Sequence, residues 1–369
     1  MSTHFSSPTL ACQSFLPAPN PLSRKYQFLG WLMAAGLALS TTPTLANALP
    51  VGEVVTANEH GASLTRISLT SGDATTQSIS IAPHNVQISA NGRYLMAVGE
   101  ATFGGHVHDG GHTHGDAPGK LKLYPANDPT GAPVASIKVG SHPAHVVSDL
   151  AGRFAFVTNA GGDSISVVNL ETKEAVTTIS TGEYPHGLRL SPDGRELYVA
   201  NVLGGSVSVI DVASQNEVAR LPVGQAPVQV GFTPDGARVF VSLRDENRVA
   251  VIDTTSREVI KRIEVGRLPI QVHATADGRF MLVANEGSEA EPDNRVSVIE
   301  LDSLTVVATH EVGAGAHGIS VDDTGRFAFI TSLYDDSLSV IDLEAGAVIS
   351  RYDTGQGPNG VTWVSHHEE

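Results

Sequence analysis

Hydrophobic and polar residues alternate in short runs along most of the chain, and turn-forming residues separate the runs. In the unit that begins at Pro185, such runs occupy residues 188–190, 196–200, 206–210 and 217–221. Alternation over so few residues predicts β-strands, and Pro192-Asp193-Gly194 between the first two runs predicts a tight turn. The unit is therefore expected to be one four-stranded antiparallel sheet. No segment after residue 48 has the hydrophobic period of a helix.

This unit recurs along the chain. A proline followed nine residues later by a glycine appears at Pro143, Pro185, Pro227 and Pro269, 42 residues apart each time. Related units begin at positions 83 and 316, and Pro358 begins a last, partial one. The step from 83 to 143 is 18 residues longer, and the step from 269 to 316 is five longer. A period of this length predicts a repeat architecture.

Repeated four-stranded sheets predict an all-β fold, a seven-bladed β-propeller. Six blades begin at residues 83, 143, 185, 227, 269 and 316. We expect the seventh blade to be split, with three N-terminal strands from residues 51–81 and an inner strand from the C-terminal residues 358–363. Closing the ring in this way removes most exposed sheet edges. The prediction is a single domain over residues 49–369, with an insertion at about 102–119.

The N-terminal residues have the features of an export signal. Arg24 and Lys25 precede an apolar run over residues 28–39, which is too short to span a bilayer, and Ala46-Asn47-Ala48 follows. This pattern predicts a cleaved signal peptide over residues 1–48, a periplasmic or secreted protein, and no membrane anchor after cleavage. Cleavage would remove Cys12, the one cysteine. Any metal would then be bound by nitrogen and oxygen atoms.

The charge of the chain bears on its partners. The formal net charge is −16, and residues 1–48 carry two basic and no acidic side chains, so the remainder is at −18. An acidic surface repels phosphate backbones, which argues against nucleic acid as a partner. We expect a monomer. The sequence has no H-E-x-x-H motif, nucleophile elbow or phosphate-binding glycine loop, so catalysis is not predicted.

The longest insertion is rich in histidine, aspartate and glycine. We expect its imidazoles and carboxylates to bind a metal ion, because the intervening glycines allow both pairs of histidines to reach one ion. Such a donor set suits zinc, and copper and nickel are not excluded. The candidate ligands in this segment are His106, His108, Asp109, His112, His114 and Asp116.

Further histidines are predicted on the same face of the ring. His84, His186 and His317 follow the residue that opens a repeat, His145 lies one position later, and His142 precedes Pro143. His60 lies in a loop equivalent to the insertion. Inner strands of a propeller line its channel, so these side chains are expected to converge near the channel mouth, with Arg189 and His273 deeper. We therefore expect a flexible loop that captures metal and a rigid central set that holds it.

Several short motifs resemble those of a known propeller family. The sequences FVTN (156–159), YVAN (198–201) and LVAN (282–285) resemble the signature of the YVTN β-propellers, and SVSVID (206–211) and SLSVID (337–342) resemble its following strand. This resemblance implies the propeller fold but no single activity, since the family includes binding, surface and haem-handling proteins. In outline, a propeller with a His-rich loop is also similar to the AztD-type periplasmic zinc metallochaperones. That similarity implies transfer of zinc to the solute-binding protein of a metal ABC importer.

Three functions remain open at this point. The first is an exported, zinc-binding metallochaperone or metal reservoir. The second is a copper- or haem-handling metalloenzyme or cofactor protein, with His84, His145, His186 and His317 as ligands. The third is a protein-binding propeller that uses no metal.

Overall fold

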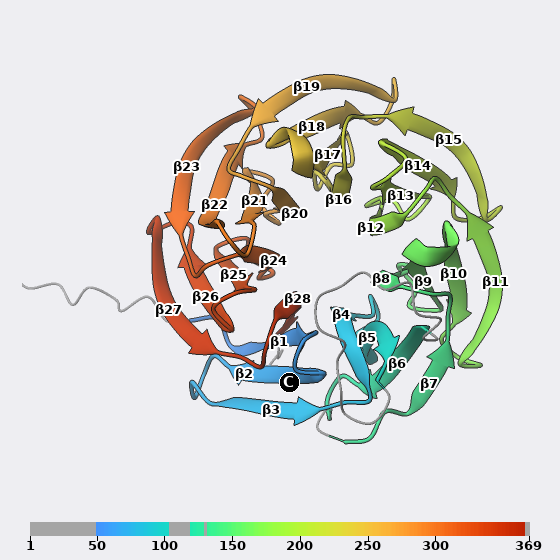
Figure 1. Cartoon of the computed structure of the whole chain (residues 1–369), viewed down its shortest axis with the longest axis horizontal. Helices are drawn as coiled ribbons and strands as arrows, with labels where there is room; N and C mark the ends of the chain where they lie inside the picture. Colours follow the sequence, from blue (N-terminus) through green and yellow to red (C-terminus); the bar gives the residue numbers. More distant parts are fainter. Residues whose placement is uncertain (1–48, 103–118, 129–130, 366–369) are drawn as a thin grey trace, which may run out of the picture. The chain divides into compact units, whose positions relative to one another are not determined.

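The computed structural model describes residues 49–102, 119–128 and 131–365. These residues form 28 β-strands and two short 3-10 helices, η1 (Ala160–Gly162) and η2 (Arg244–Glu246). The strands make seven four-stranded antiparallel sheets arranged as a ring (Figure 1). The prediction of an all-β, seven-bladed propeller is confirmed. None of the helices in the described part of the chain has the length and apolar character needed to cross a membrane.

The blades follow one another along the chain, and each runs from the channel outward. In this order, inner strand first, the six continuous blades are β4 (Ile81–Ile88), β5 (Tyr94–Ala101), β6 (Gly119–Pro125), β7 (Ala135–Lys138); β8 (Pro143–Ser148), β9 (Phe154–Asn159), β10 (Ser164–Asn169), β11 (Glu174–Ser180); β12 (Pro185–Leu190), β13 (Glu196–Asn201), β14 (Ser206–Asp211), β15 (Asn216–Pro222); β16 (Pro227–Phe232), β17 (Arg238–Leu243), β18 (Arg248–Asp253), β19 (Glu258–Glu264); β20 (Pro269–Ala274), β21 (Phe280–Gly287), β22 (Pro292–Glu300), β23 (Thr305–Glu311); and β24 (Ala316–Val321), β25 (Phe327–Ser332), β26 (Ser337–Asp342), β27 (Ala347–Asp353).

The seventh blade joins the two ends of the domain, as the repeat predicts. Its inner strand is the C-terminal β28 (Pro358–Ser365), which pairs with the N-terminal β1 (Gly52–Asn58). The sheet continues outward through β2 (Ser63–Ser68) and β3 (Ala74–Ser78). The closed ring therefore depends on hydrogen bonds between the first and last strands of the domain.

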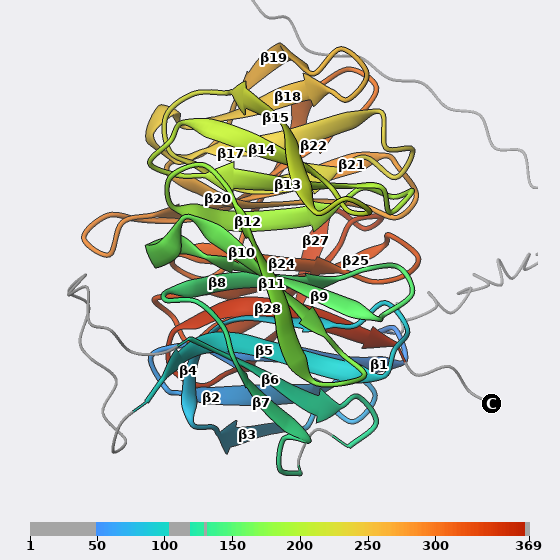
Figure 2. The same ribbon diagram turned by 90° about the vertical axis from the view of Figure 1, so that its right-hand side faces the viewer.

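Burial along a blade explains the sequence pattern. In β13 every residue after Glu196 is buried, because both faces of the sheet pack against neighbouring blades. The outer strand β15 alternates exposed and partly buried positions, since only one of its faces covers the core. Figure 2 shows the ring from the side, where the outer strand β11 crosses steeply over β8 and β9, the twist expected of such sheets.

A repeated asparagine fixes the rim of the ring that carries the candidate site. Asn201, the last residue of β13, donates to the hydroxyls of Ser206 (3.1 Å) and Ser208 (2.9 Å) on β14. Gly182, just before β12, the inner strand of the same blade, packs against Asn201 so closely that a Cβ would lie 2.5 Å from Asn201 Nδ2. The asparagine and serines of the repeat thus hold the segment that leads into each inner strand.

Candidate metal centre

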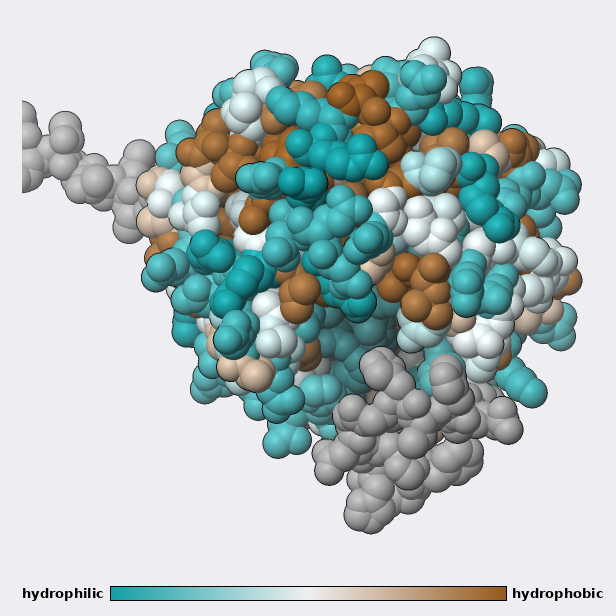
Figure 3. Space-filling model, turned by 45° about the horizontal axis from the view of Figure 1, so that its top comes forward, coloured by the Kyte–Doolittle hydropathy of each residue, from teal (hydrophilic) through white to brown (hydrophobic). Residues whose placement is uncertain are grey.

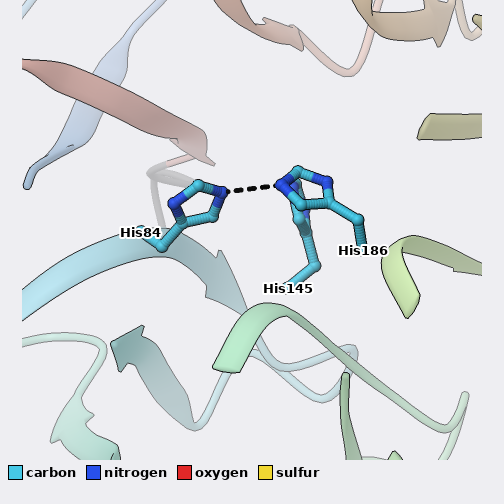
Figure 4. A group of neighbouring side chains, drawn as sticks. All are labelled: His84, His145 and His186. Carbon is cyan, nitrogen blue, oxygen red and sulfur yellow. Dashed lines mark hydrogen bonds between the residues drawn. The ribbon is translucent and has the colours of Figure 1, made fainter. Parts of the chain in front are cut away.

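Three histidines meet at the centre of the ring. His84, His145 and His186 come from the inner strands of three consecutive blades, β4, β8 and β12. Each offers one ring nitrogen, and these nitrogens all lie within 4.8 Å of one another. The ring centroids of His84 and His145 each lie 5.0 Å from that of His186 (Figure 4). We call these three residues the histidine cluster. It is the one group of three or more potential metal ligands at such spacing within the described residues.

A β-bulge in each inner strand places these side chains. The pairing of β12 with β13 shifts register between Pro185 and Leu188, and β8 and β4 shift at the corresponding positions. A bulge leaves residues out of the ladder and redirects their side chains. His84, His145 and His186 all lie within these shifts, which explains how they reach the channel.

Backbone and carboxylate acceptors set the tautomers of two of the histidines. His84 Nδ1 lies 3.0 Å from Glu59 Oε2, and His186 Nδ1 lies 3.3 Å from the carbonyl oxygen of Val228. Both oxygens only accept, so each Nδ1 carries the hydrogen and donates it. The Nε2 atoms of His84 and His186 then face one another at 3.1 Å. With both rings neutral, two lone pairs would oppose each other there, so a proton or a metal cation is required between them.

The remaining contacts of the cluster are polar. His145 Nδ1 lies 3.4 Å from the side-chain nitrogen of Gln229, a contact too long to settle its tautomer. Asn359 donates its amide to Glu59 and thereby helps to hold the carboxylate beside His84. The side-chain oxygen of Asn359 is buried and has no hydrogen-bond partner among the described residues.

Electrostatics keep most of the cluster neutral. Burial, reinforced by the neighbouring imidazoles, holds the pKa values of His145 and His186 well below the ordinary 6.5. Burial also disfavours a charge on His84, but the carboxylate of Glu59 outweighs it and raises the His84 pKa. The pKa of Glu59 is lowered: burial opposes ionisation, and His84 and the other nearby histidines outweigh it. The site thus offers the unprotonated imidazoles of His145 and His186 and the ionised carboxylate of Glu59, which favours a positive charge at His84.

His317 lies next to the cluster and outside it. Its ring centroid is 6.5 Å from that of His84, and its Nδ1 donates to the carbonyl oxygen of Asn359 over 3.0 Å. His317 Nε2 lies 3.5 Å from Glu286 Oε2, and Tyr334 donates its hydroxyl to the same carboxylate over 2.8 Å. Burial lowers the pKa of His317. The four histidines expected at the channel mouth are therefore present there as a cluster of three and a flanking fourth.

The other candidate ligands lie elsewhere. His60 is exposed, with its ring packed against Gly357, and His142 Nδ1 lies 2.7 Å from Glu100 Oε1. Neither belongs to the cluster. The six candidate ligands of the insertion lie outside the described residues: His106, His108, Asp109, His112, His114 and Asp116.

Two acidic residues at the site are not among the predicted ligands. Glu59 directly precedes His60, but nothing in the repeat marks it as a partner of His84. Glu286 lies near the end of β21, and Asp293 on the following strand β22 is paired with Arg295 and is structural. Figure 3 shows hydrophilic residues around the hollow at the centre of the face turned to the viewer.

Known proteins of similar structure share the fold of this chain. No curated protein sequence matches the chain. Among solved structures, hydrazine synthase of Kuenenia stuttgartiensis is 22% identical with a TM-score of 0.65, covering 76% of this chain and 89% of that one. A periplasmic gluconolactonase of Pseudomonas aeruginosa is 20% identical with a TM-score of 0.67, covering 85% of this chain and 99% of that one. At these identities the likeness shows the fold alone.

A family model described as a YNCE-like β-propeller matches residues 130–275 and 272–369. The two matches join into one stretch that covers about two thirds of the chain and most of the ring. The chain therefore belongs to the YNCE-like β-propeller family.

Proposed function

We propose that this protein is an exported metal-binding propeller that holds zinc at the histidine cluster and releases it to another protein. The observation that carries the proposal is the pair of Nε2 atoms of His84 and His186, 3.1 Å apart, whose Nδ1 hydrogens are both already donated. Two ligand nitrogens on a tetrahedral zinc ion lie about 3.3 Å apart, given zinc–nitrogen distances of about 2.0–2.1 Å. This pair of nitrogens is thus close to the spacing that zinc requires, and a nitrogen of His145 lies within 4.8 Å of both.

The chemistry of the donors agrees with this assignment. Neutral imidazole is a preferred zinc ligand, and a carboxylate that accepts the other ring hydrogen orients the ring and strengthens it as a ligand. Glu59 has this relation to His84, and the carbonyl of Val228 has it to His186. Copper and nickel accept the same ligands, so the donor set indicates ligation by nitrogen but does not by itself select zinc over these metals.

The His-rich insertion is proposed to deliver metal to the cluster. It connects β5 to β6, and Gly119, the first residue of β6, packs so closely on Gly140 and Pro143 that a Cβ would lie 2.0 Å from the Gly140 carbonyl oxygen. Pro143 begins β8, the strand that carries His145. Gly119, where the chain re-enters the ring after the insertion, therefore contacts the residue two positions before the cluster ligand His145. Capture there and transfer by ligand exchange would suit a metallochaperone that serves the solute-binding protein of a metal importer.

Metal content and affinity test the proposal. The purified protein is dialysed, its zinc is measured, and its affinity is determined by competition with a chromophoric chelator. We expect one zinc per chain at the cluster, an affinity loss of more than about 100-fold in a His145→Ala/His186→Ala variant, and slower loading in a variant lacking residues 104–116. His310→Ala is the matched control, because His310 lies on the outer strand β23.

The outcomes separate the competing functions. Zinc bound as tightly by the His145→Ala/His186→Ala variant as by the wild type would contradict the cluster as the holding site. Copper or haem in the purified protein would favour a cofactor protein. No tight metal in the wild type would favour a protein-binding propeller that uses no metal.

A further inference from the structure

The channel contains a second group of polar residues, which begins three residues after His186 on the inner strand β12. Arg189 follows His186 on β12, and it lines a pocket of about 300 Å³ that opens among the turns at the opposite rim. Phe232 of β16 and His273 of β20 line the same pocket. Arg189 and His273 occupy equivalent positions on the inner strands of two blades that flank a third blade. The equivalent residue of that third blade is Gly231, which has no side chain.

Arg189 has a charge that no described carboxylate neutralises. Its one hydrogen bond within the described residues runs from Nη1 to the carbonyl oxygen of the adjacent Leu188, over 2.9 Å. Burial lowers its pKa to about 10, so the guanidinium remains charged at neutral pH. A guanidinium has five N–H donors and binds carboxylates in a bidentate manner. The other four donors have no hydrogen-bond partner among the described residues.

His273 offers an acceptor beside this cation. Its Nδ1 donates to the carbonyl oxygen of Ala274 over 2.9 Å, which leaves Nε2 with its lone pair. Burial, with a smaller contribution from the charge of Arg189, lowers the His273 pKa to about 4. At neutral pH His273 is therefore uncharged and accepts a hydrogen bond through Nε2. A ligand that binds both residues needs an anionic group and a hydrogen-bond donor, for which a hydroxyl suffices.

Two aspartates line the mouth of the pocket without pairing with Arg189. Asp322 accepts the backbone N–H of Phe327 (2.8 Å) and the hydroxyl of Thr324 (2.5 Å). Asp323 Oδ2 accepts the indole N–H of Trp363 over 3.3 Å. Their negative charge repels a ligand with several anionic groups more than a ligand with one.

We infer that this pocket binds a small hydroxycarboxylate with a single negative charge. Its carboxylate accepts from Arg189, its hydroxyl donates to His273 Nε2, and its carbon atoms contact Phe232. The acidic mouth disfavours di- and tricarboxylates. This site shares the channel with the histidine cluster but does not depend on metal binding there.

Calorimetric titration of the metal-free protein tests the inference with lactate and propionate, which differ by the hydroxyl group. Lactate is expected to bind saturably at millimolar concentration, propionate about tenfold more weakly because it lacks one hydrogen bond, and citrate more weakly than lactate. Arg189→Gln should abolish lactate binding. Arg195→Gln is the control, because its exposed side chain lies near Asp193 on the same rim.

Nuclear magnetic resonance of the His273 imidazole gives a second readout that needs no variant. Lactate should shift the Nε2 resonance of His273 in the wild-type protein, and propionate should shift it less. Equal affinity for lactate in the wild type and Arg189→Gln would overturn the inference. So would the absence of saturable binding to the wild type, an equal response to lactate and propionate, or tighter binding of citrate.

Discussion

His84 and His186 face one another through their Nε2 atoms at 3.1 Å, although 102 residues separate them in the chain. Each ring is turned to this position by an acceptor behind it, Glu59 for His84 and the Val228 carbonyl for His186. Because both acceptors take the Nδ1 hydrogen, no pair of neutral tautomers can satisfy the two Nε2 atoms. The ring geometry therefore creates a position that favours a cation.

Glu59→Gln tests the link between the carboxylate and the cluster. The amide removes the negative charge that raises the His84 pKa, and it weakens the acceptor that orients the ring. We expect zinc affinity at pH 7.5 to fall about 10- to 100-fold, the usual cost of losing such a partner. The measurement is competition with a chelator. Glu174→Gln, at an exposed position on β11, should leave the affinity unchanged; an equal loss in both variants would point to general surface charge.

The stability of the metal-free protein should decrease as the pH falls below about 6.5. The pKa values of His145 and His186 are lowered in the fold, so the unfolded chain takes up protons at a higher pH than the folded chain. Their contribution is present above pH 6.5 and is lost as the pH falls towards their folded values. His84 acts in the opposite sense: its raised pKa stabilises the fold fully below pH 6.5, and this stabilisation is lost as the pH rises from 6.5 through the raised pKa of the folded state.

Urea unfolding at pH 7.5 and pH 5 measures the balance. His273, His310 and His317 also have lowered pKa values, so with His145 and His186 five histidines oppose His84. We expect a lower midpoint at pH 5, and a smaller difference between the two pH values in His145→Gln. Aspartates and glutamates with lowered pKa values change stability mainly below about pH 4.5, outside this comparison. A midpoint that rises on acidification would contradict the assignment of neutral buried histidines.

The repeat makes the fold predictable from sequence. The same features recur at fixed spacing in each unit: a proline, strands that alternate with a period of two residues, and Asn–Ser pairs. Once one unit is recognised as a four-stranded sheet, the other blades follow from the repeat. The pairing of β1 with β28 follows from counting, since three strands remain at the start and one at the end. The exact ends of the strands depend on packing and are harder to predict from sequence. For example, β4 begins at Ile81, two residues before the proline that marks the repeat.

The histidines of the site were predictable and their partners were not. His84, His145 and His186 are found by alignment on the proline, because the same backbone bulge recurs in each inner strand. Glu59 and Asn359 come from the split seventh blade and meet His84 only when the ring closes. No spacing along the chain reveals such a contact.

Asn201→Ala should destabilise the ring by about 1–3 kcal/mol. The amide of Asn201 is buried and donates to Ser206 and Ser208, so its removal leaves buried hydroxyls without that donor. Urea unfolding of the metal-free protein measures the effect. Asn216→Ala is the matched control, because Asn216 is exposed and bonds locally to the carbonyl of Ser214. Equal stability of the two variants would show that the repeated asparagine marks the family without supporting the fold.

Trp363→Ala tests the closure of the ring. Trp363 lies on the C-terminal strand β28, and its ring stacks on Phe329 of the preceding blade, with centroids 5.2 Å apart and planes 14° from parallel. Truncating a large, partly buried aromatic side chain at this junction should cost about 2–3 kcal/mol. Because β28 supplies Asn359, which bonds Glu59 beside His84, loosening this strand should also weaken zinc binding.

Phe154→Ala serves as the comparison for Trp363→Ala, since Phe154 is a partly buried aromatic residue on β9. It should reduce stability and leave zinc affinity near the wild-type value. Unfolding midpoints and chelator competition, measured on the same samples, separate the two effects. A Trp363→Ala protein that loses stability but binds zinc as the wild type does would show that the cluster is held by β4, β8 and β12 alone, without support from the closing strand.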